Sequence, residues 1–484
     1  MKLKEILRDI EVLQSTADGE LEISGISYDS RAAKPGDLFT AIVGFESDGH
    51  RYIPAAVERG AAAVLCERAP EDGTPYVLVR DSRYALAIAS RNFFGDPAGK
   101  MTMIGVTGTN GKTTSTLLMK HVLEETLGAK VGLIGTNANM IGDAVLPTER
   151  TTPESYELQR LFREMADAGC THVVMEVSSH SLVLERVAGI RFALGIFTNL
   201  TQDHLDFHKT MEAYAEAKAK LFSVCDRGVI NLDDSYGSFM IDRAQCPVMT
   251  YSVQRNEADL VAKDLKLLPD AIRFCAVTTG SIARVNLGIP GRFSAYNALD
   301  VLTGAMSLGI PLEEAAEALS SAKGVKGRME PVPTDGDYTV LIDYSHTPDA
   351  LENVLKTVRE TCSGRVVAVF GCGGDRDRTK RPIMGRIGTE LADFAIITSD
   401  NPRTEDPEEI IREILAGVSA EKGRWTAITD RAEAIAYAID NHCPGDVIVL
   451  CGKGHETYQE INHVKHHMDE REIVAEILER RKNQ

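Results

Sequence analysis

Short apolar runs alternate with helical patterns along almost the whole chain. In the first hundred residues, strands are predicted at 36–44, 61–67 and 75–81, and helices at 52–60 and 82–95. Strands that alternate with helices in this way are typical of α/β domains built on parallel sheets. The sequence therefore predicts an α/β protein.

Turn-rich stretches and repeated units divide the chain into three predicted domains, at residues 1–99, 100–326 and 327–484. The last domain contains three similar units, in which an apolar strand runs directly into a loop rich in glycine and charge. These strand–loop units lie at 365–382, 394–407 and 446–456. Loops at the carboxyl ends of strands are where open α/β sheets bind ligands, so all three loops are candidate binding segments.

Composition and charge narrow the class of protein. The chain has 484 residues, which at roughly 150 per domain also gives about three domains. Apolar residues make up 43% and the net charge is −18, which excludes a disordered chain and argues against nucleic acid as the main partner. No apolar run approaches the ~20 residues of a membrane span. Residues 1–14 predict an amphipathic helix rather than a signal peptide, so we expect a cytoplasmic protein with no membrane partner.

Nine cysteines are scattered along the chain without any C-x-x-C pair. Several lie in apolar, strand-like runs, such as Cys66 and Cys451. This distribution predicts small buried thiols rather than disulfides or a metal centre.

A glycine-rich loop follows the predicted strand at 101–106 and precedes a helix. Its residues are Gly108, Thr109, Asn110, Gly111, Lys112, Thr113 and Thr114. A strand, a glycine loop and a helix N-terminus direct backbone N–H groups at phosphates. Lys112 would reach the terminal phosphates of ATP, and the Thr113 hydroxyl would bind Mg²⁺. Val106 replaces the first glycine of the usual P-loop pattern, and the alternative is a purely structural turn.

Two further strands place metal-binding side chains where they could reach this loop. Glu176 ends the apolar run 172–177, and His204 follows the run 193–200. Both side chains would lie beside the phosphate loop if their strands flank the strand of Ile104. Because Mg²⁺ prefers oxygen ligands, Glu176 is the stronger candidate, and a buried structural carboxylate is the alternative.

One lysine is predicted to lie on a buried helical face. Between 211 and 222 the apolar residues share one stripe with Lys218, whereas Lys220 points elsewhere. A buried, unpaired ammonium costs several kcal/mol unless it is neutralised, paired or chemically altered. The alternative is that the side chain extends to the surface.

Together these motifs resemble the Mur ligase superfamily of ATP-dependent amide-forming enzymes. In the family's order they are GTNGKTT (108–114), MEVSSH (175–180), FTNLTQDHLDFH (197–208), GRFSAYNAL (291–299), GRMEPV (327–332), DYSHTPDAL (343–351), GCGGDRDRTKRPIMG (371–385), DNPR (400–403) and GKGHE (452–456). The set covers nearly the whole chain and is most similar to the MurE type, which adds the third amino acid to UDP-N-acetylmuramoyl-L-alanyl-D-glutamate.

The resemblance implies a role for each domain and its binding residues. Residues 1–99 would bind the UDP substrate, a central P-loop-type parallel sheet would bind ATP, and a Rossmann-like C-terminal domain would bind the amino acid. The ATP contacts besides the loop would be Asn297, Arg328 and Asp343. The UDP-substrate contacts would be Tyr28, Ser30, Phe45, Glu46, Ser47, Thr151, Thr152, Ser178 and Arg186, with Leu184 where relatives often have glutamine. The amino-acid contacts would be Arg376, Asp400, Asn401, Pro402, Arg403, Gly452 and Glu456; turn formation is the alternative for these loops.

The resemblance also implies a reaction. ATP, UDP-N-acetylmuramoyl-dipeptide and meso-diaminopimelate would give the UDP-tripeptide, ADP and phosphate through an acyl phosphate. The catalytic residues would be Lys112, Lys218, His204 and Glu176. Lys218 would be a carbamylated lysine (N6-carboxylysine) that joins Thr113, Glu176 and His204 in holding Mg²⁺.

Arg403 indicates which diamino acid is added, because a guanidinium can grip the second carboxylate that diaminopimelate has and lysine lacks. The alternatives are a lysine-adding relative, a folylpolyglutamate synthase-like ligase, or a P-loop switch or binding module. We expect a monomer.

Overall fold

The computed structural model describes residues 1–44, 47–148, 150–322, 324–418 and 424–482. These residues form two compact units. The first unit contains 1–259 together with 300–311, and the second contains 260–299 together with 312–484. No helix among the described residues is long and apolar enough to cross a membrane.

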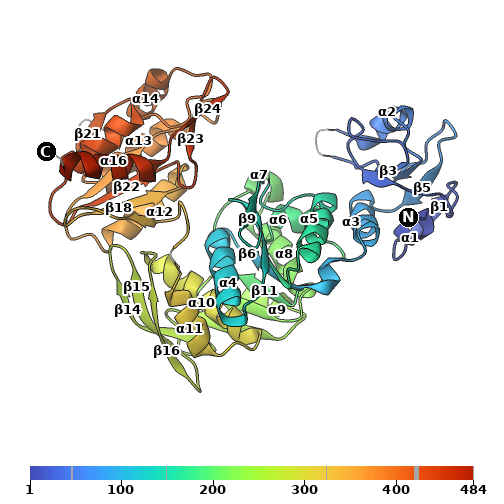
Figure 1. The fold of residues 1–484 in the computed structure, drawn as a ribbon, viewed down its shortest axis with the longest axis horizontal. Helices are drawn as coiled ribbons and strands as arrows, with labels where there is room; N and C mark the ends of the chain where they lie inside the picture. The colour runs from blue at the N-terminus through green and yellow to red at the C-terminus, as the bar shows by residue number, and fades with distance from the viewer. Residues whose placement is uncertain (45–46, 149, 323, 419–423, 483–484) are drawn as a thin grey trace. The chain divides into compact units, whose positions relative to one another are not determined.

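The N-terminal part of the first unit is a five-stranded sheet in the order β1-β5-β4-β3-β2. Figure 1 labels its strands β1, β3 and β5. Strands β2 to β5 are parallel, and β1 is antiparallel to β5. The predicted strands are β3, β4 and β5, whereas β1 and β2 were not predicted. The elements are α1 (Leu3–Ile6), β1 (Val12–Ser15), β2 (Gly25–Ser27), β3 (Asp37–Thr40), η1 (Gly49–Tyr52), α2 (Ile53–Glu58), β4 (Ala63–Cys66), β5 (Tyr76–Val79), α3 (Ser82–Phe93) and η2 (Ala98–Lys100).

The helix predicted over residues 1–14 is wrong beyond its first turns. The structure has a helix only at Leu3–Ile6, followed by the edge strand β1. Asp9 has a φ of 67°, in the left-handed region, so a right-handed helix cannot continue through it. It separates α1 from β1.

The central sheet of the first unit has the strand order β13-β12-β11-β6-β10-β7-β8-β9. Strand β6 pairs in parallel with β10 on one side and with β11 on the other. This meets the condition under which Glu176 and His204 would lie beside the phosphate loop. The strands are β6 (Thr102–Thr107), β7 (Val131–Ile134), β8 (Asn139–Ile141), β9 (Ala144–Leu146), β10 (His172–Glu176), β11 (Leu194–Phe197), β12 (Gly228–Asn231) and β13 (Val248–Ser252). The helices are α4 (Lys112–Leu127), α5 (Ser155–Asp167), α6 (Ser179–Val183), α7 (Leu205–His208), α8 (Met211–Ala219), η3 (Lys220–Ser223) and α9 (Gly237–Arg243).

Helix α4 follows the phosphate loop, as predicted. Met119 and Leu123 are fully buried, whereas Leu127 is 50% exposed and does not continue the buried stripe. Gly128 ends the helix with a φ of 58°, a conformation that favours glycine. One turn into the helix, Ser115 donates a 2.7 Å hydrogen bond to Asp300, and burial raises the pKa of that carboxyl well above its usual value.

The second unit begins with three antiparallel strands, β14 (Leu260–Leu267), β15 (Ile272–Val277) and β16 (Ile282–Leu287). Helix α10 (Arg292–Ser307) follows and is divided between the units after residue 299, and α11 (Leu312–Ser320) lies in the second unit. Burial alternates along β16, the pattern of a sheet with one face against the core. The sequence pattern did not predict these antiparallel strands.

The C-terminal sheet has the order β17-β18-β22-β19-β20-β21 and is parallel except for β17. Figure 1 labels its strands β18, β21 and β22. The three predicted strand–loop units are β19, β20 and β22, whose order in the sheet is β22-β19-β20. The elements are β17 (Glu330–Val332), β18 (Thr339–Asp343), α12 (Pro348–Arg359), β19 (Val366–Phe370), α13 (Lys380–Leu391), β20 (Phe394–Ile397), α14 (Pro407–Leu415), β21 (Arg424–Ala427), α15 (Arg431–Asp440), β22 (Val447–Cys451), the hairpin β23 (Tyr458–Ile461) and β24 (Val464–His467), and α16 (Glu470–Lys482).

The cysteines form no disulfide. All nine are free thiols, and five of them, including Cys66 in β4 and Cys451 in β22, are buried. The prediction of small buried thiols is confirmed for these five. Cys443 is exposed.

Candidate active site

The phosphate loop requires glycine at two positions. At Gly108, where φ is 154°, an added Cβ would lie 1.8 Å from the Thr198 hydroxyl oxygen. Gly111 precedes α4 with a φ of 89°. The loop therefore leads directly into the first turn of α4, whose backbone N–H groups face the loop. A glycine loop followed by a helix N-terminus is the usual geometry of an anion-binding site.

The lysine of the loop folds back on it. The Lys112 ammonium donates to the carbonyl oxygens of Gly108 at 2.8 Å and Thr109 at 2.9 Å. This places the positive charge over the loop, where phosphate oxygens would lie when a nucleotide binds.

Glu176 ends β10 beside the first turn of α4. Its Oε1 accepts hydrogen bonds from the Thr113 hydroxyl at 3.0 Å and from the Thr136 N–H at 2.9 Å. Its Oε2 accepts from the Thr136 hydroxyl at 3.0 Å. The structure thus brings together Thr113 and Glu176, two of the predicted metal ligands. Oxygen donors of this kind fit Mg²⁺.

His204 lies near the loop, where its side chain contacts Asp203 and His180. It has a φ of 53°, is exposed, and its Nε2 is 3.4 Å from the Asp203 carboxylate. Its ring packs edge-on against His180, with centroids 4.9 Å apart. Within the described part of the chain, no group of three or more His, Cys, Asp or Glu side chains is placed to hold a metal.

Lys218 is buried, as the helical stripe predicted, and it does not extend to the surface. Its ammonium donates to the carbonyl oxygen of Gly108 at 2.8 Å and lies 4.5 Å from the centre of the Tyr214 ring. Burial, reinforced by nearby Lys112, holds the pKa of this ammonium well below its usual value. Lys220 is exposed, also as predicted.

A cavity of about 380 Å³ opens beside Glu176. Four of the predicted UDP-substrate residues line it, and the residues are Thr136, Thr148, Arg150, Thr151, Thr152, Ser178, His180, Arg186 and His204. Thr152 ties the wall together, because its hydroxyl donates to the Glu176 carbonyl at 2.8 Å and accepts from the Ser178 N–H at 3.1 Å. Arg186 donates to the Thr152 carbonyl at 3.1 Å and pairs with Glu154 at 2.7 Å.

Three of the remaining predicted UDP-substrate residues, Tyr28, Ser30 and Ser47, lie in loops of the N-terminal part of the first unit. The Tyr28 hydroxyl donates to Glu157 of α5 at 2.9 Å, and burial raises the pKa of this tyrosine. Ser30 is buried, and the Ser47 hydroxyl donates to that of Tyr52 at 3.0 Å. Phe45 and Glu46 lie outside the described residues.

The predicted adenosine residues lie in the second unit. Asp343 ends β18, where its carboxylate accepts from the backbone N–H groups of Met329 at 2.8 Å and Ser345 at 2.9 Å. Arg328 lies over the Tyr344 ring, 5.4 Å from its centre. Arg328 and Asp343 are therefore neighbours, while Asn297 is buried in α10.

The three predicted amino-acid loops meet at the carboxyl edge of the C-terminal sheet. Gly373 lies against both predicted arginines, because a side chain at this position would lie 2.9 Å from the Arg403 Nη1 and 3.8 Å from the Arg376 Cγ. A side chain at Gly452 would lie 2.5 Å from the Asp400 Oδ2. That oxygen is buried and has no hydrogen-bond partner among the described residues. The loops after β19, β20 and β22 thus form one site.

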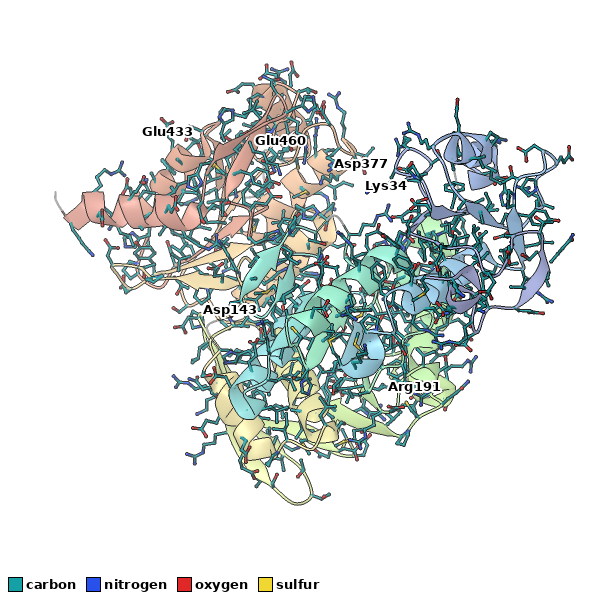
Figure 2. All side chains as sticks on the ribbon, turned by 45° about the vertical axis from the view of Figure 1, so that its right-hand side comes forward. Lys34, Asp143, Arg191, Asp377, Glu433 and Glu460 are labelled. Atoms are coloured by element: carbon teal, nitrogen blue, oxygen red, sulfur yellow. The ribbon has the colours of Figure 1, made fainter. Side chains whose placement is uncertain are left out.

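Arg403 is held from two sides. Its Nε donates at 3.1 Å to Glu460 in strand β23, a residue labelled in Figure 2. Its Nη1 donates to the Gly374 carbonyl at 2.8 Å. These bonds use two of the five N–H groups of a guanidinium, leaving three for a carboxylate. Pro402 and Arg403 also border a cavity of about 940 Å³, which Arg376, Gly452 and Glu456 do not line.

Several residues of these sites were not predicted. Thr136, Arg150 and His180 line the 380 Å³ cavity, and Lys453 and Glu460 contact predicted amino-acid residues. His180 and Lys453 lie inside the MEVSSH and GKGHE motifs, which could have drawn attention to them. The other three carry no sequence signal.

Comparison with known proteins identifies the family. The Mur ligase middle domain matches residues 106–305, the Mur ligase glutamate ligase domain matches 327–454, and the Mur ligase family catalytic domain matches 22–94. The chain belongs to the Mur ligase family. It is 48% identical over 481 residues to the UDP-N-acetylmuramoyl-L-alanyl-D-glutamate–2,6-diaminopimelate ligase of Caldanaerobacter subterraneus, with 99% of each chain covered. Identity to the ligase of the same name from Clostridium botulinum is 47%, again over 99% of each chain.

Solved structures agree with this assignment. A UDP-N-acetylmuramoyl-L-alanyl-D-glutamate–2,6-diaminopimelate ligase is similar over 100% of both chains, with a TM-score of 0.76 and 34% identity. A Thermotoga maritima MurF ligase in complex with ADP has a TM-score of 0.60 at 20% identity, with 96% of this chain and 100% of that chain covered. At that identity it supports the fold alone.

Proposed function

We propose that this protein is an ATP-dependent ligase that adds meso-2,6-diaminopimelate to UDP-N-acetylmuramoyl-L-alanyl-D-glutamate in peptidoglycan precursor synthesis. The observation that carries the proposal is that the chain is nearly half identical, over 99% of both lengths, to ligases of that name. The glycine-restricted phosphate loop of one unit and the loops that carry Arg376 and Arg403 in the other support it. We further propose that the chain acts as a monomer and that residues 1–99, 100–326 and 327–484 bind the UDP substrate, ATP and the amino acid, respectively.

The reaction requires one carboxylate to be phosphorylated and then attacked by an amine. The glutamate carboxylate attacks the γ-phosphate, releasing ADP, and the amine then displaces phosphate from the acyl phosphate. Lys112 and the N–H groups at the start of α4 stabilise charge on the phosphoryl oxygens. Thr113, Glu176 and His204 would hold Mg²⁺, which supplies further charge neutralisation when bound. His204 serves as a metal-site residue rather than a general base.

Lys218 would complete the metal site as a carbamate. Two ammonium groups, those of Lys112 and Lys218, donate to the same Gly108 oxygen, so one of them is stabilised by losing its charge. The lowered pKa of Lys218 favours the neutral amine, and only a neutral amine can add CO₂. Addition would convert a buried cation into an anionic oxygen ligand.

Lys218→Ala is expected to lower kcat by at least about 100-fold, because a metal ligand is lost. Short-chain carboxylates such as acetate should restore part of the rate by occupying the vacated position. The measurement is ADP release with and without added acetate, and Lys220→Ala, which removes an exposed lysine from the same segment, serves as the control. Full activity of Lys218→Ala without any additive would show that the carbamate is not needed.

The function itself is tested by the substrate requirement for ADP release. We expect wild-type enzyme to form ADP only when the UDP-dipeptide and an amino acid are both present. Steady ADP release without the amino acid would instead indicate a P-loop switch. A preference for a folate substrate would indicate the folylpolyglutamate synthase alternative.

A further inference from the structure

We infer that Lys453 is a positioning residue for the amino acid that the enzyme adds. Lys453 is not one of the predicted binding residues. The inference rests on the proposed function. Lys453 follows β22 and Gly452, and its side chain is completely buried. A lysine is almost never fully buried unless it is paired, so its partners indicate what it does.

The two partners of Lys453 are predicted contacts of the added amino acid, and they lie on two different loops. Its ammonium donates to the Asn401 Oδ1 at 2.8 Å and to the Glu456 Oε2 at 2.7 Å. The ammonium nitrogen of Lys453 also lies over the Tyr458 ring, 5.1 Å from the ring centre. Lys453 therefore joins the loop after β20 to the loop after β22.

These contacts determine how Asn401 and Glu456 are presented. The Asn401 Oδ1 also accepts from the Glu460 N–H at 2.8 Å, so its Nδ2 is the atom that donates to the Glu456 Oε2, at 3.0 Å. Two donors thus occupy Oε2, whereas Oε1 accepts no hydrogen bond from the described residues. A carboxylate held by one oxygen presents the other to a cationic group, and the amino acid carries ammonium groups.

The buried Asp400 Oδ2 is a second unpaired carboxylate oxygen in this site. Asp400 and Asn401 are adjacent, so the bond from Lys453 to Asn401 also restrains the segment that carries Asp400. Lys453 would act through these side chains without touching the substrate, which makes it a positioning residue rather than a catalytic one.

The test is a double-mutant cycle on Lys453 and Glu456 in the full-length enzyme. Lys453→Met should raise the KM for meso-diaminopimelate by about 10- to 100-fold, the usual effect of one charged hydrogen bond. The KM values for ATP and the UDP-dipeptide should change by less than about 2-fold. Lys453→Met/Glu456→Gln should lose less than the product of the two single losses, because Lys453 acts in part through Glu456.

Lys465→Met is the matched control. Lys465 lies on the neighbouring strand β24, is exposed, and places its ammonium 4.1 Å from the centre of the same Tyr458 ring. It should leave every KM unchanged. A purely structural role for Lys453 would instead lower the melting temperature and affect all three KM values alike.

An unchanged KM for diaminopimelate in Lys453→Met would overturn the inference. If that variant does not fold, Lys453→Arg takes its place, because it keeps the charge but moves the donor groups, and it should raise the KM for diaminopimelate while leaving the other two KM values unchanged. Fully multiplicative losses in the Lys453 and Glu456 variants would show that Lys453 does not act through Glu456. Wild-type enzyme that forms no ADP with diaminopimelate would refute the proposed function, and the inference with it.

Discussion

Lys112→Ala is expected to lower the rate of ADP formation by roughly 1000-fold or more, because it removes the cation that stabilises charge on the transferred phosphoryl group. Binding of the UDP-dipeptide should persist, since Lys112 is not one of its predicted contacts and does not line the 380 Å³ cavity. Coupled ADP assays and isothermal titration with the UDP-dipeptide measure the two effects separately.

The control for this variant is Lys120→Ala. Lys120 lies on the same helix, α4, and pairs with Glu124 at 2.6 Å, away from the loop. It should retain ADP formation. A folded Lys112→Ala enzyme that no longer binds the UDP-dipeptide would contradict the separation of the two sites.

Arg403→Ala should abolish the preference for diaminopimelate over lysine. Wild-type enzyme is expected to prefer diaminopimelate by at least about 100-fold in kcat/KM, because a charged hydrogen bond contributes about 1.5–3 kcal/mol and Arg403 can make two. Arg403→Lys keeps the charge but loses the two-pronged contact, so it should retain only part of the preference. The measurement is kcat/KM for both amino acids in all three enzymes.

Arg412→Ala is the control for Arg403. It removes an exposed arginine from α14 whose partner is Glu409, and the preference should be unaffected. Equal use of both amino acids by wild-type enzyme, or an unchanged preference in Arg403→Ala, would show that the loop after β20 does not recognise the second carboxylate.

Parallel strands and their loops were predictable because each carries its own local pattern. Glu176 and His204 could lie beside the phosphate loop only if their strands flank β6, and the sheet order shows that they do. The antiparallel strands β14 to β16 were not predicted, because a strand with one exposed face, such as β16, alternates polar and apolar residues and forms no continuous apolar run. The N-terminal helix was overextended because a left-handed residue such as Asp9 leaves no trace in a hydrophobic pattern.

Candidate site residues were predictable where a motif surrounds them and not where contacts cross between loops. Lys218 was found from the stripe it shares with apolar neighbours, and the structure shows it buried. The bond between Lys453 and Asn401 joins positions 52 residues apart, and Glu460 reaches Arg403 from a separate hairpin. Such pairings depend on how loops fold over the sheet edge, which periodicity does not encode.

The predicted amino-acid loops and Lys453 lie at one edge of the C-terminal sheet, and the β23–β24 hairpin that holds Arg403 belongs to the same unit, whereas the phosphate loop belongs to the other unit. Under the proposed function, recognition of the acceptor amino acid is therefore modular. Evolution can change which amino acid is joined by substitutions along a single sheet edge, without altering the residues that activate the carboxylate. An inhibitor directed at that edge would block binding of the acceptor amino acid while leaving nucleotide binding intact.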